Sequence, residues 1–291
     1  MTLPLRSLAA ALSLLLLLAT VGCSTGLKLA YDNLERLALW EVDSEIDLDD
    51  AQKAAFRDEF RALHQWHRQT QLPLYAADLR ALADAIDGNA DLGAAIIAML
   101  GKAEAHGKQL WERAQPGAER LLTRLGDAQV TAYDARQRTA IDEEAREHAD
   151  DSLEDRRKLW LREWRNSLDR WIGKLNDRQR ALLDAAWISE QPQLRTPAEH
   201  AAARLARHQR LIAGLATRSE PGLTDRLIAA ADPRERARSD AAQARERVLL
   251  ARLLDAADTR QRDRLKATVR ELADDFERLS RRGASVASAA P

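Results

Sequence analysis

The chain has 291 residues, a formal net charge of −1 at pH 7, 31% charged residues, 4% aromatic residues and one cysteine. This balance gives no excess positive charge to attract nucleic acid, and a single cysteine cannot form an intramolecular disulfide. Helix-favouring residues, mainly Ala, Leu, Arg, Glu, Asp and Gln, dominate the composition. We therefore expect an all-α protein of about nine amphipathic helices in hairpins or bundles, with no nucleic-acid partner.

Residues 1–22 have the three parts of a secretory signal peptide: a basic residue, an apolar run and small residues before Cys23. The apolar run is shorter than the roughly 20 residues that a membrane-spanning helix needs. The "TVGC" that ends at Cys23 resembles the lipobox of bacterial lipoproteins. That resemblance implies cleavage between Gly22 and Cys23 and attachment of acyl chains such as palmitate to the cysteine sulfur. An ordinary cleaved signal with an incidental cysteine is the alternative.

The residue after the cysteine is Ser24. In Gram-negative lipoproteins an aspartate at this position usually signals retention in the inner membrane. The resemblance therefore implies a protein held at the periplasmic face of the outer membrane, with the membrane as partner through its acyl chains. Residues 23–26 form the expected tether, which is short enough to keep the fold within about 10 Å of the headgroups.

The rest of the chain reads as successive amphipathic helices, bracketed by capping residues and prolines. The expected ranges are 27–42, 49–72, 73–86, 91–125 with an interruption at Pro116 and Gly117, 127–148, 153–174, 176–187, 196–218, a helix from 232, and 258–282. A loop at 189–195 suggests a boundary between a first half, 27–188, and a second half, 189–282. Residues 283–291 have nothing to pack and are expected to be disordered.

A short pattern recurs four times: "LDDAQ" at Leu48, "LGDAQ" at Leu125, "LNDRQ" at Leu175 and "ADTRQ" at Ala257. In each, an N-cap residue precedes a glutamine by three, which is the spacing of a capping box. The capping residues and glutamines are Asp49 and Gln52, Gly126 and Gln129, Asn176 and Gln179, and Asp258 and Gln261. Four independent helix starts would explain the pattern. The similar spacing within the first and second pairs instead suggests a tandem duplication of one helical hairpin unit.

The repeated pattern resembles the Leu-Thr-x-x-Gln motif of the Spy and CpxP group of periplasmic stress proteins and chaperones, although threonine is absent from all four second positions. A broader resemblance, over most of the mature chain, is to a family of proteobacterial lipoproteins known only as a domain of unknown function. It is carried by Leu29, Tyr31, Asn33, Trp40, Asp47, Leu48, Gln52, Trp66, His67, Pro73 and Tyr75. It implies a helical lipoprotein and carries no assigned catalytic residues.

The sequence contains no phosphate-binding glycine loop, nucleophile elbow or His-Glu-x-x-His motif. We therefore assign no catalytic residue, no cofactor and no metal site. The sequence alternative is a metal site at His64 and His67, which have helical spacing. A second feature, the run Trp160, Trp164, Leu168, Trp171 and Leu175, forms one apolar stripe on a helix. Core packing is the favoured interpretation of this stripe, and a partner-binding groove is the alternative.

These observations favour a non-catalytic binding or chaperone-like envelope protein, with a protein or an unfolded polypeptide as partner. The alternative is an envelope-modifying enzyme or metal-binding protein that uses the region around His64 and His67.

Overall fold

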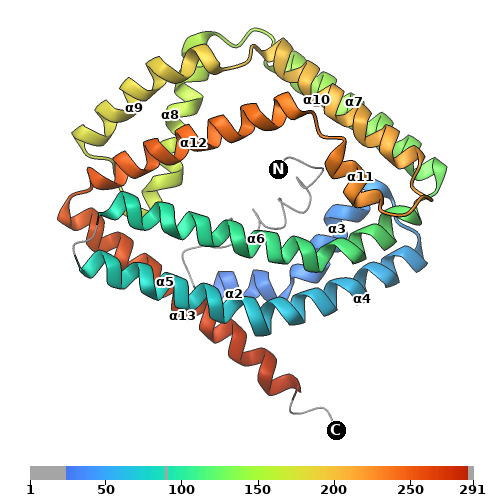
Figure 1. Ribbon diagram of the computed structural model, residues 1–291, viewed down its shortest axis with the longest axis horizontal. Helices are drawn as coiled ribbons and strands as arrows, with labels where there is room; N and C mark the ends of the chain where they lie inside the picture. The colour runs from blue at the N-terminus through green and yellow to red at the C-terminus, as the bar shows by residue number, and fades with distance from the viewer. Residues whose placement is uncertain (1–23, 89–90, 288–291) are drawn as a thin grey trace. The chain divides into compact units, whose positions relative to one another are not determined.

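A computed structural model describes residues 24–88 and 91–287 of the chain (Figure 1). The expected signal peptide, its cleavage site at Gly22 and the acylation site Cys23 lie outside the described residues. The described residues are all-helical and contain no strand. They form more helices than the nine expected, because residues 27–42 are divided between two helices and the stretch after residue 222 contains a short helix of its own.

The division near the amino terminus falls at Asn33. Helix α2 spans Ser24–Asp32 and α3 spans Leu34–Ile46. The Asn33 side chain donates from Nδ2 to the carbonyl of Leu29 at 2.6 Å, as asparagines do when they compete with backbone hydrogen bonds. Since α2 already begins at Ser24, helix extends through most of the stretch expected to be a tether.

The chain forms two compact units, and each draws on three separate segments of sequence. Unit 1 comprises the residues up to Gln65, then Leu110–Asp150 and Arg195–Ser239. Unit 2 comprises Trp66–Gln109, Asp151–Leu194 and the residues from Asp240 onward. Each unit therefore contains residues from both of the sequential halves expected from the loop at 189–195.

Unit 1 contains α2, α3, α4 (Asp50–Trp66, up to Gln65), the end of α6 (Leu92–Thr123), α7 (Asp127–Glu147), α10 (Pro197–Ala216), α11 (Leu223–Ala229) and the start of α12 (Pro233–Asp255). Helices α7 and α10 run side by side (Figure 1), and α3 packs on α7. A small core forms where Leu215 of α10 meets Leu223 and Leu227 of α11.

Helix α6 continues through Pro116, where the sequence predicted an interruption, so that expectation is wrong. A proline inside a helix removes one backbone hydrogen bond, but packing can offset this loss. The next residue shows where the packing is close, because a Cβ on Gly117 would lie 3.2 Å from Oε2 of Glu59 on α4. Glycine at this position lets α6 approach α4, and Arg120 of α6 donates from Nε to Oε1 of Glu59 at 2.6 Å.

Unit 2 contains a π-helical turn η1 (His67–Gln71), α5 (Leu72–Asp87), the beginning of α6, α8 (Leu153–Ile172), α9 (Asp177–Glu190), a 3₁₀ turn η2 (Gln191–Gln193), the rest of α12, and α13 (Thr259–Ala287). The π turn lies just before Pro73, which begins the second of the expected ranges 49–72 and 73–86. Leu72 donates its backbone N–H to the carbonyl of His67, five residues back. This wider turn makes room for the proline ring, which would crowd the carbonyl of Gln69 in a regular helix.

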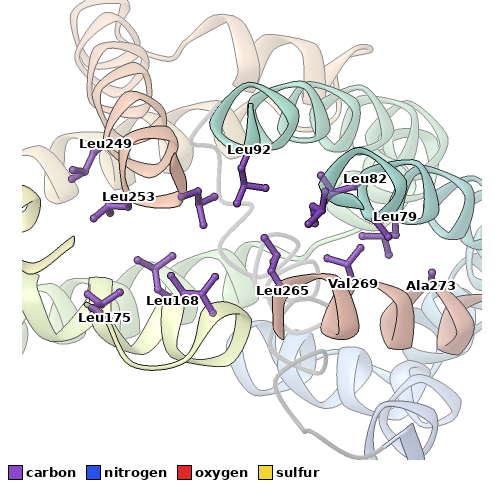
Figure 2. Close-up of a cluster of buried hydrophobic side chains, with 14 of the residues drawn as sticks. Leu79, Leu82, Leu92, Leu168, Leu175, Leu249, Leu253, Leu265, Val269 and Ala273 are labelled. Atoms are coloured by element: carbon purple, nitrogen blue, oxygen red, sulfur yellow. The ribbon is translucent and has the colours of Figure 1, made fainter. Parts of the chain in front are cut away.

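The core of unit 2 is formed by leucines from several helices (Figure 2). The buried side chains point toward one another from α5, α6, α8, α12 and α13, and include Leu82, Leu92, Leu168, Leu253 and Leu265. Leu168 and Leu175 of the predicted apolar stripe are buried in this core, and Trp160, Trp164 and Trp171 pack against it while half-buried. The prediction that this stripe serves core packing is confirmed.

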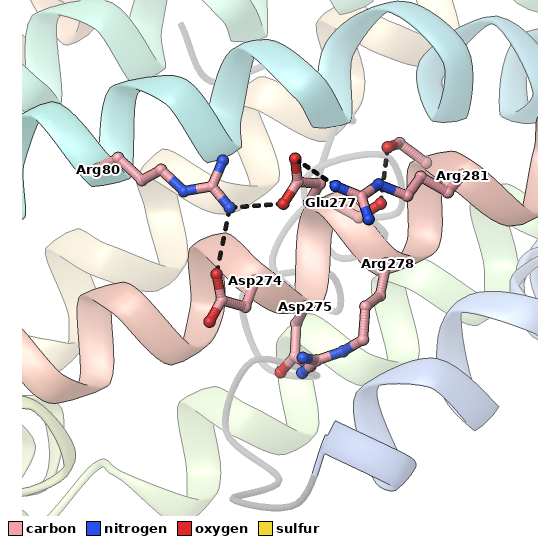
Figure 3. Close-up of polar contacts among 7 residues, drawn as sticks. Arg80, Asp274, Asp275, Glu277, Arg278 and Arg281 are labelled. Atoms are coloured by element: carbon pink, nitrogen blue, oxygen red, sulfur yellow. Dashed lines mark hydrogen bonds and ion pairs between the residues drawn. The ribbon is translucent and has the colours of Figure 1, made fainter.

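Helices α5 and α13 run side by side in unit 2 (Figure 1). Arg80 of α5 donates from Nη2 to Asp274 at 3.1 Å and to Glu277 at 2.6 Å, and Glu277 also pairs with Arg281 at 2.9 Å (Figure 3). These groups are exposed enough that salt and side-chain entropy reduce their contribution to stability, so the apolar contacts carry the packing. Helix α13 continues to Ala287, through residues that were expected to be disordered.

A candidate ligand cavity and the paired glutamines

Unit 1 encloses a large open cavity of about 1,220 Å³. Its walls come from α3, α4, α6, α7, α10 and α11, and most of the side chains that line it are apolar. They include Leu37, Val42, Ile46, Phe56, Phe60, Leu63, Trp111, Leu121, Leu122, Leu125, Val130, Ile141, Leu211, Leu215 and Leu227. A cavity of this size with apolar walls and a few polar groups has the character of a ligand site.

The amphipathic pattern of α4 and α6 explains why the walls are apolar. On α4, Phe56 and Phe60 lie one turn apart, and their rings stack at 5.7 Å between centroids. On α6, Trp111, Ala114 and Ala118 recur at helical spacing and present one side of the helix to the cavity. Small alanines beside large rings leave a gap between the helices, because they do not fill the space toward the opposite wall.

One end of the cavity is closed by the first two copies of the repeated motif. Asp49 and Gln52 form a capping box at the start of α4, with Gln52 N donating to Asp49 Oδ1 at 2.8 Å and Asp49 N donating to Gln52 Oε1 at 3.0 Å. At the start of α7, Gly126 N donates to Gln129 Oε1 at 2.8 Å. Glycine has no side chain, so only this half of the box forms there.

The two glutamines also join their helix starts to one another. Gln52 Nε2 donates to Gln129 Oε1 at 3.0 Å, and Gln129 Nε2 donates to Gln52 Oε1 at 2.7 Å. Each amide further donates to the backbone of the partner motif, Gln52 to the carbonyl of Arg124 at 2.9 Å and Gln129 to that of Asp47 at 2.8 Å. Asp47 adopts a left-handed conformation with φ 61°, which turns its carbonyl toward this partner.

The third and fourth copies form the corresponding arrangement in unit 2. Asn176 and Gln179 make a full capping box, and Asp258 and Gln261 make the other. Gln261 Nε2 donates to Gln179 Oε1 and to the carbonyl of Lys174, both at 2.9 Å. Here Asn176 Nδ2 takes the part of a glutamine amide, donating to the carbonyl of Ala256 at 2.9 Å and to Gln261 Oε1 at 3.2 Å. Gln179 is fully buried.

The charged side chains at the cavity are six arginines and four carboxylates, so the lining carries more positive than negative charge. Glu59 lies next to Arg120, and the hydrogen bond from that guanidinium holds the pKa of Glu59 below its usual range despite partial burial. The positive charges of Arg113 and Arg124 also lower the pKa of Glu59. Three arginines therefore act on this one carboxylate at the cavity.

A polar group on the other wall involves α7 and α10. His208 is buried and lies 2.6 Å from Asp134 Oδ1 through its Nε2, and its ring contacts that of Tyr133. The hydrogen bonds from His208 and Arg138 lower the pKa of Asp134, although burial opposes them. Burial and the nearby Glu45 raise the pKa of Tyr133. Tyr133 therefore stays a neutral phenol at neutral pH and offers the cavity a hydrogen-bonding hydroxyl.

The two histidines proposed as ligands contact separate sets of aromatic rings. His64 of α4 lies against Tyr31 and Phe60 at centroid distances of 4.4 and 5.9 Å. His67 is buried and contacts Tyr75 at 5.5 Å. Among the residues that the structure describes, no group of three His, Cys, Asp or Glu side chains is placed to hold a metal ion.

Tyr75 also contacts a histidine that the sequence did not single out. Its ring lies 4.8 Å from that of His106, whose Nε2 is 2.8 Å from Asp78 Oδ2. Burial raises the pKa of Tyr75 to about 12. The hydrogen bonds from His106 and Lys102 lower the pKa of Asp78 against the opposing effect of burial. This group packs the π turn and α5 against α6 inside unit 2, so it serves the fold of that unit.

The comparison with known families adds a match to a family of unknown function, DUF6279, over residues 44–240. The chain belongs to the DUF6279 family. The matched range includes the motifs of Gln52, Gln129 and Gln179 and most of the cavity wall, and it ends before Gln261. No curated protein and no solved structure matches the chain. None of the described helices is long and apolar enough to cross a membrane.

The sequence pattern predicted the glutamine motifs, but it did not predict the cavity. Its lining residues have the same apolar pattern as ordinary core positions, so periodicity alone cannot separate a wall that faces a neighbour from one that faces a void. The small residues Ala114, Gly117 and Ala118 among the larger apolar residues of α6 are the signal that could have pointed to it.

Proposed function

We propose that this chain is a non-catalytic binding protein of the bacterial envelope, chaperone-like in that it takes up apolar ligands in the unit 1 cavity. The observation that carries the proposal is the cavity itself, with a volume of about 1,220 Å³ and mostly apolar walls. A contiguous exposed apolar surface often marks a site for a ligand or a protein partner. An exposed segment of an unfolded polypeptide is the ligand expected from the sequence.

A filled cavity tests this proposal. Ala118 of α6 lines the cavity, and Ala118→Trp places a large ring in it. Ala135 of α7 is exposed and does not line the cavity, so Ala135→Trp is the matched control in the same unit. We expect the full chain and Ala135→Trp to suppress aggregation of an unfolded client, and Ala118→Trp to suppress it less. Equal aggregation with and without the unmodified protein would contradict the proposal.

We also propose that Cys23 is acylated and holds the protein at the periplasmic face of the outer membrane. The support comes from the signal-peptide pattern, the lipobox-like residues before Cys23 and the serine that follows it. Labelling of cells with a fatty-acid analogue should mark the protein and should fail for Cys23→Ala. Separation of the inner and outer membranes then tests the location, and recovery in the inner membrane would contradict it.

The paired glutamines support a further proposal, that the two pairs descend from one duplicated hairpin unit related to the Leu-Thr-x-x-Gln proteins. The first two motifs are 77 residues apart and the last two are 82 apart. In three of the four motifs, the glutamine amide donates to a carbonyl five residues before the partner glutamine, at Asp47, Arg124 and Lys174, and in the other case the Asn176 amide does so at Ala256. An experimental structure should superimpose the Gln52–Gln129 pair on the Gln179–Gln261 pair with their flanking turns. Turns that do not superimpose would favour independent origins.

A further inference from the structure

Three arginines, two on α6 and one just after its end, lie around one carboxylate at the cavity. Arg113, Arg120 and Arg124 all line the cavity, and all three act on Glu59. Only Arg120 makes an ion pair with it, at 2.6 Å. Within the part of the chain that the structure describes, Arg113 and Arg124 have no ion pair. Two positive charges therefore remain beside an apolar cavity after Glu59 is neutralised.

The lining holds three other carboxylates, Glu41, Glu45 and Asp58, and the latter two contact groups other than these arginines. Asp58 lies 3.7 Å from Arg61 on its own helix, and Glu45 accepts a hydrogen bond from Gln137 at 2.7 Å. On the opposite wall, Arg204 also lines the cavity, and it pairs with Glu144. With six arginines against four carboxylates, the lining keeps a surplus of positive charge, to which Arg113 and Arg124 contribute.

A ligand that matches this cavity has a large apolar part and a negative group at one end. Arginine recognises phosphate and carboxylate with directed, charge-assisted hydrogen bonds. The cavity volume of about 1,220 Å³ exceeds the usual range of small-molecule sites, roughly 300–1,000 Å³, and suits more than one hydrocarbon chain. An anionic phospholipid combines both properties.

We infer that the unit 1 cavity binds an anionic phospholipid, with its acyl chains between α4, α6 and α10 and its phosphate at Arg113 and Arg124. The inference rests on the proposed binding role of the cavity and names its ligand class. The apolar contacts supply affinity, and the two guanidinium groups select the anionic head. Trp40, which lines the cavity and is 66% exposed, provides an apolar contact for chains that enter from solvent or from a bilayer.

Photo-crosslinking of the full chain tests the inference. The protein is placed in phosphatidylcholine vesicles that contain phosphatidylglycerol with a photoreactive group at the end of one acyl chain. After illumination, the labelled peptides are identified by mass spectrometry. A diacylglycerol with the same photoreactive chain is the probe without charge. We expect phosphatidylglycerol to label peptides that contain cavity residues such as Leu63, Leu121 and Leu211, and diacylglycerol to label them much less.

Paired variants separate the arginines from general charge. Arg113→Gln with Arg124→Gln should lower labelling by phosphatidylglycerol by at least about tenfold, because two charge-assisted hydrogen bonds are lost. Arg36→Gln with Arg146→Gln removes the same charge from exposed positions of unit 1 outside the cavity and should change labelling by less than about twofold. Circular dichroism confirms that each pair of substitutions leaves the helical fold intact.

Two results would overturn the inference. Equal labelling of the cavity by both lipids would show that the arginines do not select the head group, and labelling outside the cavity alone would show that the lipid binds elsewhere. Either result leaves suppression of client aggregation by the unmodified protein, and its loss in Ala118→Trp, to stand by itself. Conversely, arginine-dependent labelling without client protection would support the lipid site and remove the chaperone-like role.

Discussion

Gln52 and Gln129 donate hydrogen bonds to each other's amide oxygens, at 3.0 and 2.7 Å, across the starts of two helices that are 77 residues apart in sequence. Each oxygen also accepts the backbone N–H of its own N-cap residue. Each glutamine side chain thereby caps the N-terminus of its own helix and also binds that N-terminus to the start of another helix. The repeated motif therefore links the N-termini of two helices by hydrogen bonds. The four copies form two pairs, one in each unit.

The pair in unit 2 gives a direct test of this role. Gln179→Leu keeps the approximate size of the side chain but leaves the carbonyl of Leu253 without its donor and removes one of the two acceptors of Gln261 Nε2, at a fully buried site. We expect a loss of about 3 kcal/mol in the free energy of unfolding, measured with urea. Gln209→Leu, at an exposed position of α10, should change it by less than about 0.5 kcal/mol. Similar losses of unfolding free energy in both variants would mean that the buried amide of Gln179 contributes no more to stability than an exposed glutamine.

Glu119 predicts a pH dependence. Helix α11 begins at Leu223, after the N-cap residue Gly222, which has no side chain to cap it, and Glu119 of α6 accepts instead from Leu223 N at 3.0 Å and from Thr224 N at 3.2 Å. The hydrogen bond from the Thr224 hydroxyl and these backbone N–H groups lower the pKa of Glu119 below its ordinary value of 4.5. A carboxyl whose pKa is lower in the folded state stabilises the fold above its unfolded pKa, and this stability is lost as the pH falls.

We therefore expect Glu119→Gln to be less stable than the unmodified chain at pH 7, by about 1 kcal/mol. The difference should shrink as the pH falls through 4.5 and below, where the unmodified carboxyl also becomes protonated. Urea unfolding of both proteins between pH 7 and pH 3 measures this. A difference that stays constant over the range would assign the effect to packing.

Two glycines of α6 give a matched pair of substitutions. A Cβ on Gly93 would lie 2.7 Å from Asp255 Oδ2 and 2.9 Å from the carbonyl of Ala251, both on α12, whereas a Cβ on Gly101 would meet nothing within 4 Å. Gly93→Ala should cost about 1–3 kcal/mol because α12 must move. Gly101→Ala should stabilise the chain by about 0.5–1 kcal/mol, because alanine loses less backbone entropy in a helix. Thermal unfolding measures the change in stability of each variant. A change of the same sign in both variants would contradict the close approach of α6 to α12 at Gly93.

Two tryptophans separate core packing from surface exposure. Trp164 packs against the unit 2 core, and Trp160 lies beside it with ring centroids 6.0 Å apart. Trp164→Ala should lower the free energy of unfolding by about 3 kcal/mol, at the low end for a tryptophan because the side chain is only half-buried. Trp40→Ala, at a side chain that is 66% exposed, should leave stability nearly unchanged. Equal changes in the free energy of unfolding for both variants would instead favour the partner-binding groove as the role of the tryptophan stripe.

Much of the fold could be predicted because its determinants are local. The apolar stripe of α8, the N-cap at Thr196 with Pro197 and Glu199, and the four glutamine motifs all act within a few residues. The prediction was wrong where a distant contact decides: α6 runs through Pro116 because Gly117 lets it pack on α4. Helix propensity depends on neighbouring residues, so it cannot predict a contact whose partner is far away in sequence.

The candidate site was less predictable for the same reason. Capping geometry follows from spacing, but the pairing of Gln52 with Gln129 and of Gln179 with Gln261 requires the tertiary fold. The cavity depends on which faces of α3, α4, α6, α7 and α10 meet and where small residues leave space. His64 and His67 illustrate the converse, because residues that are close in sequence contact different aromatic neighbours.

The alternation of the two units along the chain restricts how this protein can be divided. Each unit needs its third segment, Arg195–Ser239 or the residues from Asp240 onward, so no contiguous fragment contains all of one unit without much of the other. A truncation after residue 194 would strip both units of helices that complete their cores. During synthesis, neither unit can close until the last third of the polypeptide has emerged, and the loops closed at that point are long. All segments of unit 1 have thus been made at Ser239, whereas unit 2 still awaits the residues from Asp240 onward.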